Sequence, residues 1–186
     1  MLSLSVFAQA KKPLPKPKPP VIKAENSVID AATPANKKDF SIEAIVVYPS
    51  GEVVPVSRST FYILDTDLLT ILKNAEIQPI ENTLQISKDD TDKALISDAG
   101  YSLSGKYSSP YSELAEKVSK AIKAHIVQQI TTDSQGKGTF KRLDGENYYL
   151  FGTGGTRFSN VIWNMKIDTT TNSSIILDQN NAASAY

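Results

Sequence analysis

The sequence predicts a mainly β protein, an antiparallel β-sandwich that carries an inserted two-helix segment. Two patterns support this fold class. Short stretches of alternating polar and apolar residues recur along the chain, and clusters of Gly, Asp, Asn and Ser separate them. One central stretch instead shows helical periodicity. The length of 186 residues suits one domain with a substantial core and a tail.

The first ten residues form a short apolar run that ends in Ala8-Gln9-Ala10, the small-x-small pattern accepted by signal peptidases. We interpret residues 1–10 as a signal peptide remnant that is cleaved after Ala10. A secreted, periplasmic or cell-envelope location is therefore expected. No other stretch approaches the roughly 20 apolar residues that a spanning helix needs, so the mature chain is predicted to have no transmembrane segment.

Residues 11–20 alternate proline with lysine, a composition that favours an extended polyproline spacer. Together with the polar residues that follow, they predict a disordered linker at 11–39. The linker is either a plain spacer or a basic segment that extends the reach of the domain or is attracted to anionic envelope polymers. The folded domain is then expected at 40–181, with a short C-terminal tail at 182–186.

Charge is distributed unevenly along the chain. Residues 1–40 hold seven Lys and three acidic residues, whereas residues 41–186 hold 13 basic and 17 acidic residues. The domain has no concentrated Lys/Arg face, so nucleic acid is not an expected partner. The chain contains no cysteine, which excludes disulfides, thiolate metal sites and a cysteine nucleophile.

Strand patterns open the folded domain. From Ser41 the apolar residues alternate and share one face, which holds Ile42, Ala44, Val46 and Tyr48. Pro49-Ser50-Gly51 supplies a turn, and further strands are expected at 52–56 and 60–64.

A helical insertion is expected at about 66–127. Its first helix follows a cap at Thr66 or Asp67, and residues 75–108 are mostly polar and poorly periodic. The second helix starts at Ser109-Pro110. Its apolar stripe, which we expect to pack on the sandwich, consists of Leu114, Val118, Ala121, Ile122 and His125.

The chain returns to strand patterns after the insertion. Strands are expected at about 128–132, 138–143, 146–151, 159–168 and 174–179. In the fourth of these, one face holds Val161, Trp163, Met165 and Ile167.

The stretch 132–150 resembles the pattern of carboxypeptidase-regulatory-like, prealbumin-type domains. It contains a Thr132-Asp133 turn, a glycine at Gly136, an aromatic strand around Phe140, a second glycine turn at Gly145, and Tyr148-Tyr149-Leu150. With the opening hairpin, the resemblance covers about half of the chain. It implies a prealbumin/Ig-like sandwich and a non-catalytic accessory or binding module.

Three local patterns partly resemble functional sites, but their residues favour structural roles. A single histidine, His125, cannot form a multi-histidine metal site, and a hydrolase would need partners that the sequence does not identify. The glycine-rich stretch 152–156 lacks the Lys-Ser/Thr and helix of a P-loop and predicts a flexible hairpin loop. Residues 89–92 lack the Gly and Glu of a calcium loop and predict a solvated acidic loop. No catalytic residue, cofactor or metal is therefore expected.

The expected function is a non-enzymatic binding or structural module, with a protein or an envelope polysaccharide as partner. The helical insertion and the 152–158 loop are expected to make the contact, because recognition usually lies on loops of a rigid scaffold. A carbohydrate-binding module using surface aromatics is the alternative, and a hydrolase is a weaker one. The candidate ligand or partner residues are Tyr149, Arg157, Phe158 and Trp163.

Overall fold

The computed structural model describes residues 37–105, 111–143, 147–155 and 160–185. The predicted signal peptide at 1–10, most of the predicted linker and Gly145 lie outside these residues. The elements in chain order are β1 (Lys38–Val47), β2 (Val53–Pro55), β3 (Thr60–Leu64), α1 (Leu68–Asn74), α2 (Glu81–Ile86), α3 (Thr91–Leu103), α4 (Ser112–Lys123), β4 (Ile126–Thr131), β5 (Lys137–Leu143), β6 (Tyr148–Gly155), β7 (Asn160–Ile167), β8 (Ser174–Leu177) and β9 (Ser184–Ala185).

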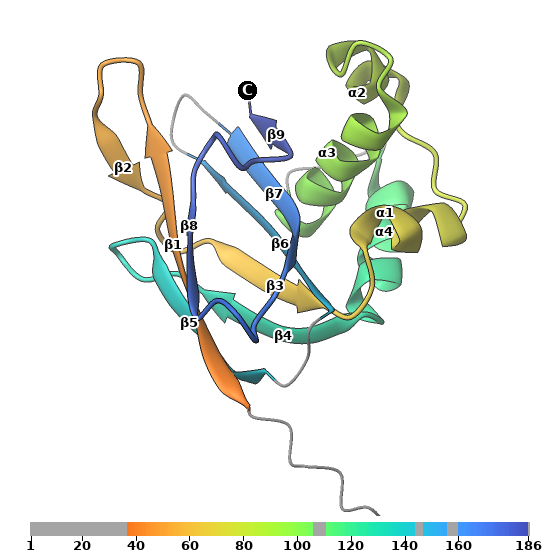
Figure 1. Cartoon of the computed structure of the whole chain (residues 1–186). Helices are drawn as coiled ribbons and strands as arrows, with labels where there is room; N and C mark the ends of the chain where they lie inside the picture. The colour runs from red at the N-terminus through yellow and green to blue at the C-terminus, as the bar shows by residue number, and fades with distance from the viewer. Residues whose placement is uncertain (1–36, 106–110, 144–146, 156–159, 186) are drawn as a thin grey trace, which may run out of the picture. The chain divides into compact units, whose positions relative to one another are not determined.

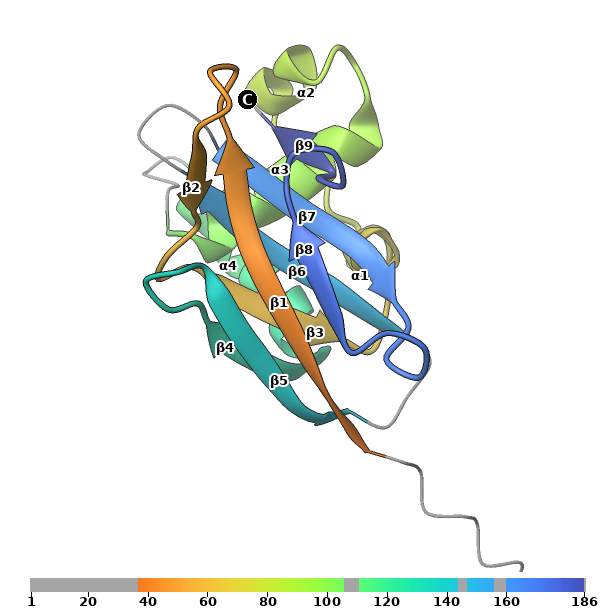
Figure 2. The same ribbon diagram turned by 60° about the vertical axis from the view of Figure 1, so that its left-hand side comes forward.

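The strands form two sheets that face each other, which confirms the predicted β-sandwich (Figure 1). In the first sheet β1 pairs with β2, β5 and β8, and in the second the order is β4-β3-β6-β7-β9. Every pairing is antiparallel except β1 with β8. Figure 2 shows β1 of the first sheet in front of the second sheet.

The domain has three layers, because helices cover the outer side of the second sheet (Figure 1). The core between the two sheets contains Phe40, Ile42, Ala44, Val46, Val56, Phe61, Ile63, Phe140, Leu143, Leu150, Val161, Trp163, Ile167 and Leu177. The core between the second sheet and the helices contains Leu64, Leu68, Ile71, Leu72, Ile77, Leu95, Ile96, Ala99, Val118, Ile122, Phe151 and Ile162. The central strands of the second sheet, β3, β6 and β7, thus contribute buried residues to both cores.

This double burial explains why strands of the second sheet are apolar without strict alternation. In β7, Val161 and Trp163 face the first sheet while Ile162, between them, faces the helices. Tyr148 and Tyr149 likewise pack on opposite sides of β6. In contrast, β1 alternates as predicted, because only one of its faces lies in a core.

The insertion contains four helices among the described residues, so the prediction of two was wrong. The stretch 75–108, which lacks an apolar stripe, holds α2 and α3. Residues 94–100 of α3 are all buried, so this helix has no solvent-facing side in its centre to give an amphipathic pattern. Asp98 is among the buried residues, and its carboxylate accepts a hydrogen bond of 2.9 Å from the Ile80 backbone N–H at the start of α2.

Two aspartates cap helices of the insertion. The Asp67 carboxylate accepts a 3.0 Å hydrogen bond from the Thr70 N–H, which confirms the predicted cap of the first helix. The Asp90 carboxylate accepts from the Lys93 N–H at 3.1 Å and caps α3. The run 89–92, predicted as a solvated acidic loop, therefore includes the start of a helix.

The apolar stripe of α4 is buried within the domain, as predicted, in a core that it shares with α1, α3 and the second sheet. Val118 and Ile122 are fully buried, and Leu114 and Ala121 are partly buried against the same core. His125 does not belong to this stripe, because α4 ends at Lys123 and the histidine follows it.

Two further expectations are corrected. Residues 152–155, expected in a flexible loop, belong to β6, where a Cβ on Gly152 would lie 2.1 Å from the Phe61 ring and one on Gly154 would lie 2.1 Å from Val56. Gly152 thus allows close packing with Phe61 of the neighbouring strand β3, and Gly154 allows it with Val56. At the chain ends, β1 begins at Lys38, inside the predicted linker, and Ser184–Ala185 of the predicted tail form β9 on β7.

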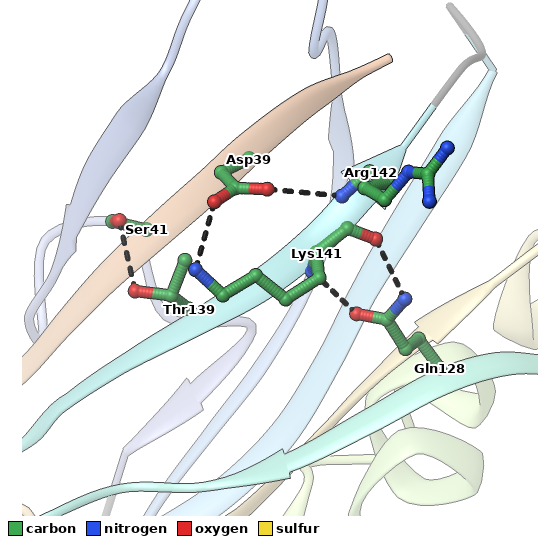
Figure 3. Close-up of polar contacts among 6 residues, drawn as sticks. All are labelled: Asp39, Ser41, Gln128, Thr139, Lys141 and Arg142. Carbon is green, nitrogen blue, oxygen red and sulfur yellow. Dashed lines mark hydrogen bonds and ion pairs between the residues drawn. The ribbon is translucent and has the colours of Figure 1, made fainter.

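Two glutamine side chains join backbone groups at strand edges. The Gln128 amide of β4 accepts from the Lys141 N–H at 2.7 Å and donates to the Lys141 carbonyl at 2.9 Å, as Figure 3 shows. Beyond the end of β8, the Gln179 amide makes the same two bonds to Val47, at 2.9 and 2.8 Å. Each amide thus replaces a missing strand partner.

Asp39 stabilises an irregularity between β1 and β5 next to Gln128 (Figure 3). Its carboxylate accepts from Lys141 Nζ at 2.8 Å and from the Arg142 N–H at 3.1 Å, and Arg142 has a φ of 55°. These hydrogen bonds lower the pKa of the Asp39 carboxyl.

Asp168 is expected to make the stability of the domain depend on pH. Hydrogen bonds from the hydroxyl groups of Thr170 and Thr171, at 2.6 and 2.7 Å, lower the pKa of Asp168 to about 2. The pKa of this carboxyl in the folded protein lies below the value of 3.8 in the unfolded chain, so the ionised carboxylate stabilises the fold at pH values above 3.8. This stabilisation is lost as the pH falls through about 2. Asp168→Asn should therefore be less stable than the wild type at pH 7, and the gap should close between pH 4 and 2. Urea unfolding across this range measures it; a gap independent of pH would contradict the assignment.

Candidate functional site

A polar pocket of about 400 Å³ lies on the helix-facing side of the second sheet, beyond the end of α3. It is lined by Arg58, Ser59, Thr60, Tyr62, Leu103, Ser104, Thr153, Gly154, Gly155 and Asn160. A smaller hollow between α3 and β7 adjoins it and shares several of these residues. The volume falls within the range of small-molecule sites, and residues from a turn, three strands and the end of a helix converge on it, so we take this pocket as the candidate ligand site.

The wall of the pocket is set by a close contact between α3 and the sheet. A Cβ on Gly100 would lie 2.7 Å from Ile162 Cδ1 and 3.0 Å from Thr153 Cγ2. The glycine therefore lets α3 approach β6 and β7. Because the helix ends at Leu103, α3 itself does not extend over the part of the sheet that lines the pocket.

Arg58 lies at the edge of this pocket in a strained turn between β2 and β3. Its φ is 53°, a left-handed conformation that costs a non-glycine residue about 1 kcal/mol or more. Buried Thr132 holds the turn: its carbonyl accepts from the Arg58 N–H at 3.0 Å and its hydroxyl donates to the Val56 carbonyl at 2.7 Å. Ser59 adds a hydrogen bond of 3.1 Å from its N–H to the same hydroxyl. The arginine backbone is thus fixed before any ligand arrives.

Tyr62 contributes a half-buried phenol to the pocket. Its ring stacks on Phe151 with a centroid separation of 6.3 Å and an interplanar angle of 21°. Burial raises the pKa of the Tyr62 phenol, so its hydroxyl stays protonated near neutral pH and available as a donor.

Several polar groups of the pocket have no protein partner among the described residues. Within the described residues, no hydrogen bond or ion pair involves the Arg58 guanidinium, the Tyr62 hydroxyl or the side chains of Thr60 and Thr153. Neighbouring Ser104, in contrast, donates its hydroxyl to the Tyr101 carbonyl at 3.1 Å. Hydrogen-bond donors and acceptors that line one pocket, and that no described protein group satisfies, can bind water or a polar ligand.

Of the candidate residues named from the sequence, the described ones, Tyr149 and Trp163, do not line this pocket. Trp163 is 0% exposed, and its indole N–H donates to the Asp178 carbonyl at 2.9 Å, so an exposed aromatic platform that includes Trp163 is wrong. Tyr149 is half-buried against the helices. Arg157 and Phe158 lie outside the described residues.

The two segments expected to make the contact do meet at the pocket. Thr153 and Gly155 belong to the predicted 152–158 segment, and Leu103 and Ser104 belong to the helical insertion. The sequence analysis missed Arg58 and Tyr62. A sequence signal that could have identified Tyr62 is the alternation in β3, where Thr60 and Tyr62 alternate with the core residues and are less apolar than these.

His125 and Asp65 form a second polar pair, at the base of the insertion. The imidazole Nδ1 lies 2.8 Å from Asp65 Oδ1, and the Asp65 N–H donates to the His125 carbonyl at 3.1 Å. Burial opposes ionisation of Asp65, but the hydrogen bonds from His125 and Thr66 outweigh it and lower the pKa of the carboxyl. The pair joins the two ends of the insertion, and no hydroxyl of the described residues hydrogen-bonds to this histidine as the nucleophile of a triad would.

The described residues offer neither a metal-binding cluster nor a membrane-spanning helix. There, no three His, Asp or Glu side chains are grouped so that they could hold a metal ion. Of the helices in the same ranges, none has the length and apolar character to cross a bilayer.

Comparisons with known proteins return little. No protein-family model matches the chain, and no curated protein matches it. A solved structure from Pseudomonas aeruginosa, described as a candidate carbohydrate binding protein, shares 11% sequence identity with a TM-score of 0.38. The alignment covers 80% of this chain and 92% of that chain. At this TM-score the similarity carries no weight for the function.

Proposed function

We propose that this chain is a non-catalytic binding module that takes a polyhydroxylated ligand, a carbohydrate, in the pocket between β3, β6, β7 and the end of α3. The observation that supports it most is the set of polar groups without described protein partners, from Arg58, Thr60, Tyr62 and Thr153, around one cavity. Sugars present many hydroxyl groups that both donate and accept, which matches such a lining.

The stacked pair of Tyr62 and Phe151 adds to the proposal. A half-buried aromatic ring beside polar groups offers an apolar surface for the C–H face of a sugar ring and a hydroxyl at its edge. The hydrogen bonds that hold the Arg58 backbone favour binding as well, because a backbone fixed in advance loses less conformational entropy when a ligand binds.

Mutation of Tyr62 tests the site. Tyr62→Phe removes one hydroxyl and keeps the ring, so affinity for a bound saccharide should fall by a factor of about 5 to 10, the value of one or so hydrogen bonds. Titration of saccharides against a ¹⁵N-labelled protein would locate the shifts, which should cluster at Thr60, Thr153 and Asn160. The matched control is Tyr149→Phe, outside the pocket, which should bind as the wild type does. Shifts elsewhere, or weakening by the control alone, would reject the pocket.

The secreted or envelope location and the relation to carboxypeptidase-regulatory-like domains stay predictions from the sequence. They agree with this function, since an exported sandwich that follows a Pro/Lys-rich linker would meet envelope polysaccharides. A protein partner remains the alternative occupant, and shifts that appear with cell-envelope protein but with no saccharide would favour it.

A further inference from the structure

We infer that the ligand of the pocket is an acidic saccharide whose carboxylate pairs with Arg58. The inference rests on the proposed function and names the class of sugar that the site selects. It follows from the charge of the lining, from the backbone conformation of Arg58 and from the opposite character of the two ends of the pocket.

The charge of the lining is positive. Among the described residues that line the pocket and its adjoining hollow, none is acidic, and Arg58 is the single cationic one. Its guanidinium has no carboxylate or carbonyl partner in the described part of the chain. An arginine that has no counter-ion among the described residues, at the edge of a polar hollow, offers two parallel N–H donors that match a carboxylate.

The backbone of Arg58 is held in an unusual conformation. A left-handed φ of 53° is supported from both sides, because the Thr132 carbonyl accepts from Arg58 and the Thr132 N–H donates to the Ser59 carbonyl at 2.9 Å. Strained backbone that its surroundings fix firmly tends to occur where a side chain must be aimed. Here the turn brings the arginine to the cavity.

The two ends of the pocket differ in polarity. Arg58 and Thr60 lie on the β3 side, whereas Ser104 and Asn160 lie on the side of α3 and β7, about two strand spacings or roughly 10 Å away. The carboxyl end of α3 carries a partial negative charge, equivalent to about half an elementary charge. A ligand with hydroxyl donors at one end and a carboxylate at the other, as in a uronic acid disaccharide, complements both ends.

Matched pairs of probes test the inference. Disaccharides of glucuronate, galacturonate, mannuronate and guluronate would each be titrated beside their methyl esters, which keep the ring and remove the negative charge. At least one acid should bind about tenfold more tightly than its ester, the value of a charge-assisted hydrogen bond. Arg58→Gln should abolish that preference, and rising salt should weaken the acid more than the ester.

Arg142→Gln is the control, because Arg142 is also exposed with a φ of 55° but does not line the pocket. It should keep the preference for the acid. Binding of acid and ester with equal affinity would overturn the inference and leave the proposed function in place. Absence of pocket shifts with every acid, ester and neutral disaccharide would overturn both. Melting temperatures of the two arginine variants within about 2 °C of the wild type would show that a loss reflects binding.

Discussion

Val118→Asp should unfold the domain or lower its melting temperature by roughly 10 °C or more. Val118 of α4 is 0% exposed in the core between the helices and the second sheet. A carboxylate there would be buried without a partner, which costs about 3–5 kcal/mol, and each kcal/mol shifts the melting temperature of a domain of this size by about 2–4 °C. Thermal unfolding followed by circular dichroism measures the change.

The same substitution at an exposed valine is the control. Val127 of β4 is 45% exposed, so Val127→Asp should change the free energy of unfolding by about 1 kcal/mol or less. If Val118→Asp instead melted like the wild type and lost only self-association, α4 would pack against another chain and its contact with the sheet would be wrong.

Trp163→Ala should destabilise the domain by about 3–5 kcal/mol through loss of a large buried side chain. The ring packs at a centroid distance of 5.6 Å from Phe61, at the centre of the core between the sheets. Chemical denaturation followed by circular dichroism gives the free energy of unfolding. An exposed binding residue would behave differently: its loss would weaken ligand binding and leave the stability unchanged.

A milder variant separates the packing of the ring from its hydrogen bond. Trp163→Phe keeps an aromatic ring but leaves the Asp178 carbonyl without its 2.9 Å indole donor, so a loss of about 1–3 kcal/mol is expected. In the wild type, Trp163 is the sole tryptophan, and its fluorescence should be blue-shifted and protected from acrylamide until the protein unfolds. Emission typical of a solvated indole in the folded protein would contradict its burial.

Local sequence patterns predicted the elements that have one buried face. The alternation around Ile42 and Val46 and the stripe through Val118 each show which side of the backbone lies in a core. The same reasoning failed for α3, because a helix buried across residues 94–100 has no periodic contrast. It also misjudged the glycines of β6, which mark close packing with Phe61 and Val56 and do not mark a loop.

Local sequence patterns could not predict the pocket. Its lining combines a turn before β3, the end of α3 and parts of β6 and β7, segments that only the tertiary fold brings together. Arg58 follows Ser57 in an ordinary polar stretch, and its left-handed conformation depends on Thr132, far along the chain. The aromatic residues, more conspicuous in the sequence, turned out to serve packing in the case of Trp163.

The glutamines at the strand edges bear on how the protein behaves at high concentration. Unpaired N–H and C=O groups at a sheet edge are the groups through which strands of separate molecules join and aggregate. At Lys141 and Val47 those groups are already occupied by the amides of Gln128 and Gln179. An amide side chain reproduces the hydrogen bonds of a strand but cannot be extended by another one. At these two positions, therefore, the backbone N–H and C=O groups are satisfied within the molecule, and a strand of a neighbouring chain cannot pair with them to start a fibre.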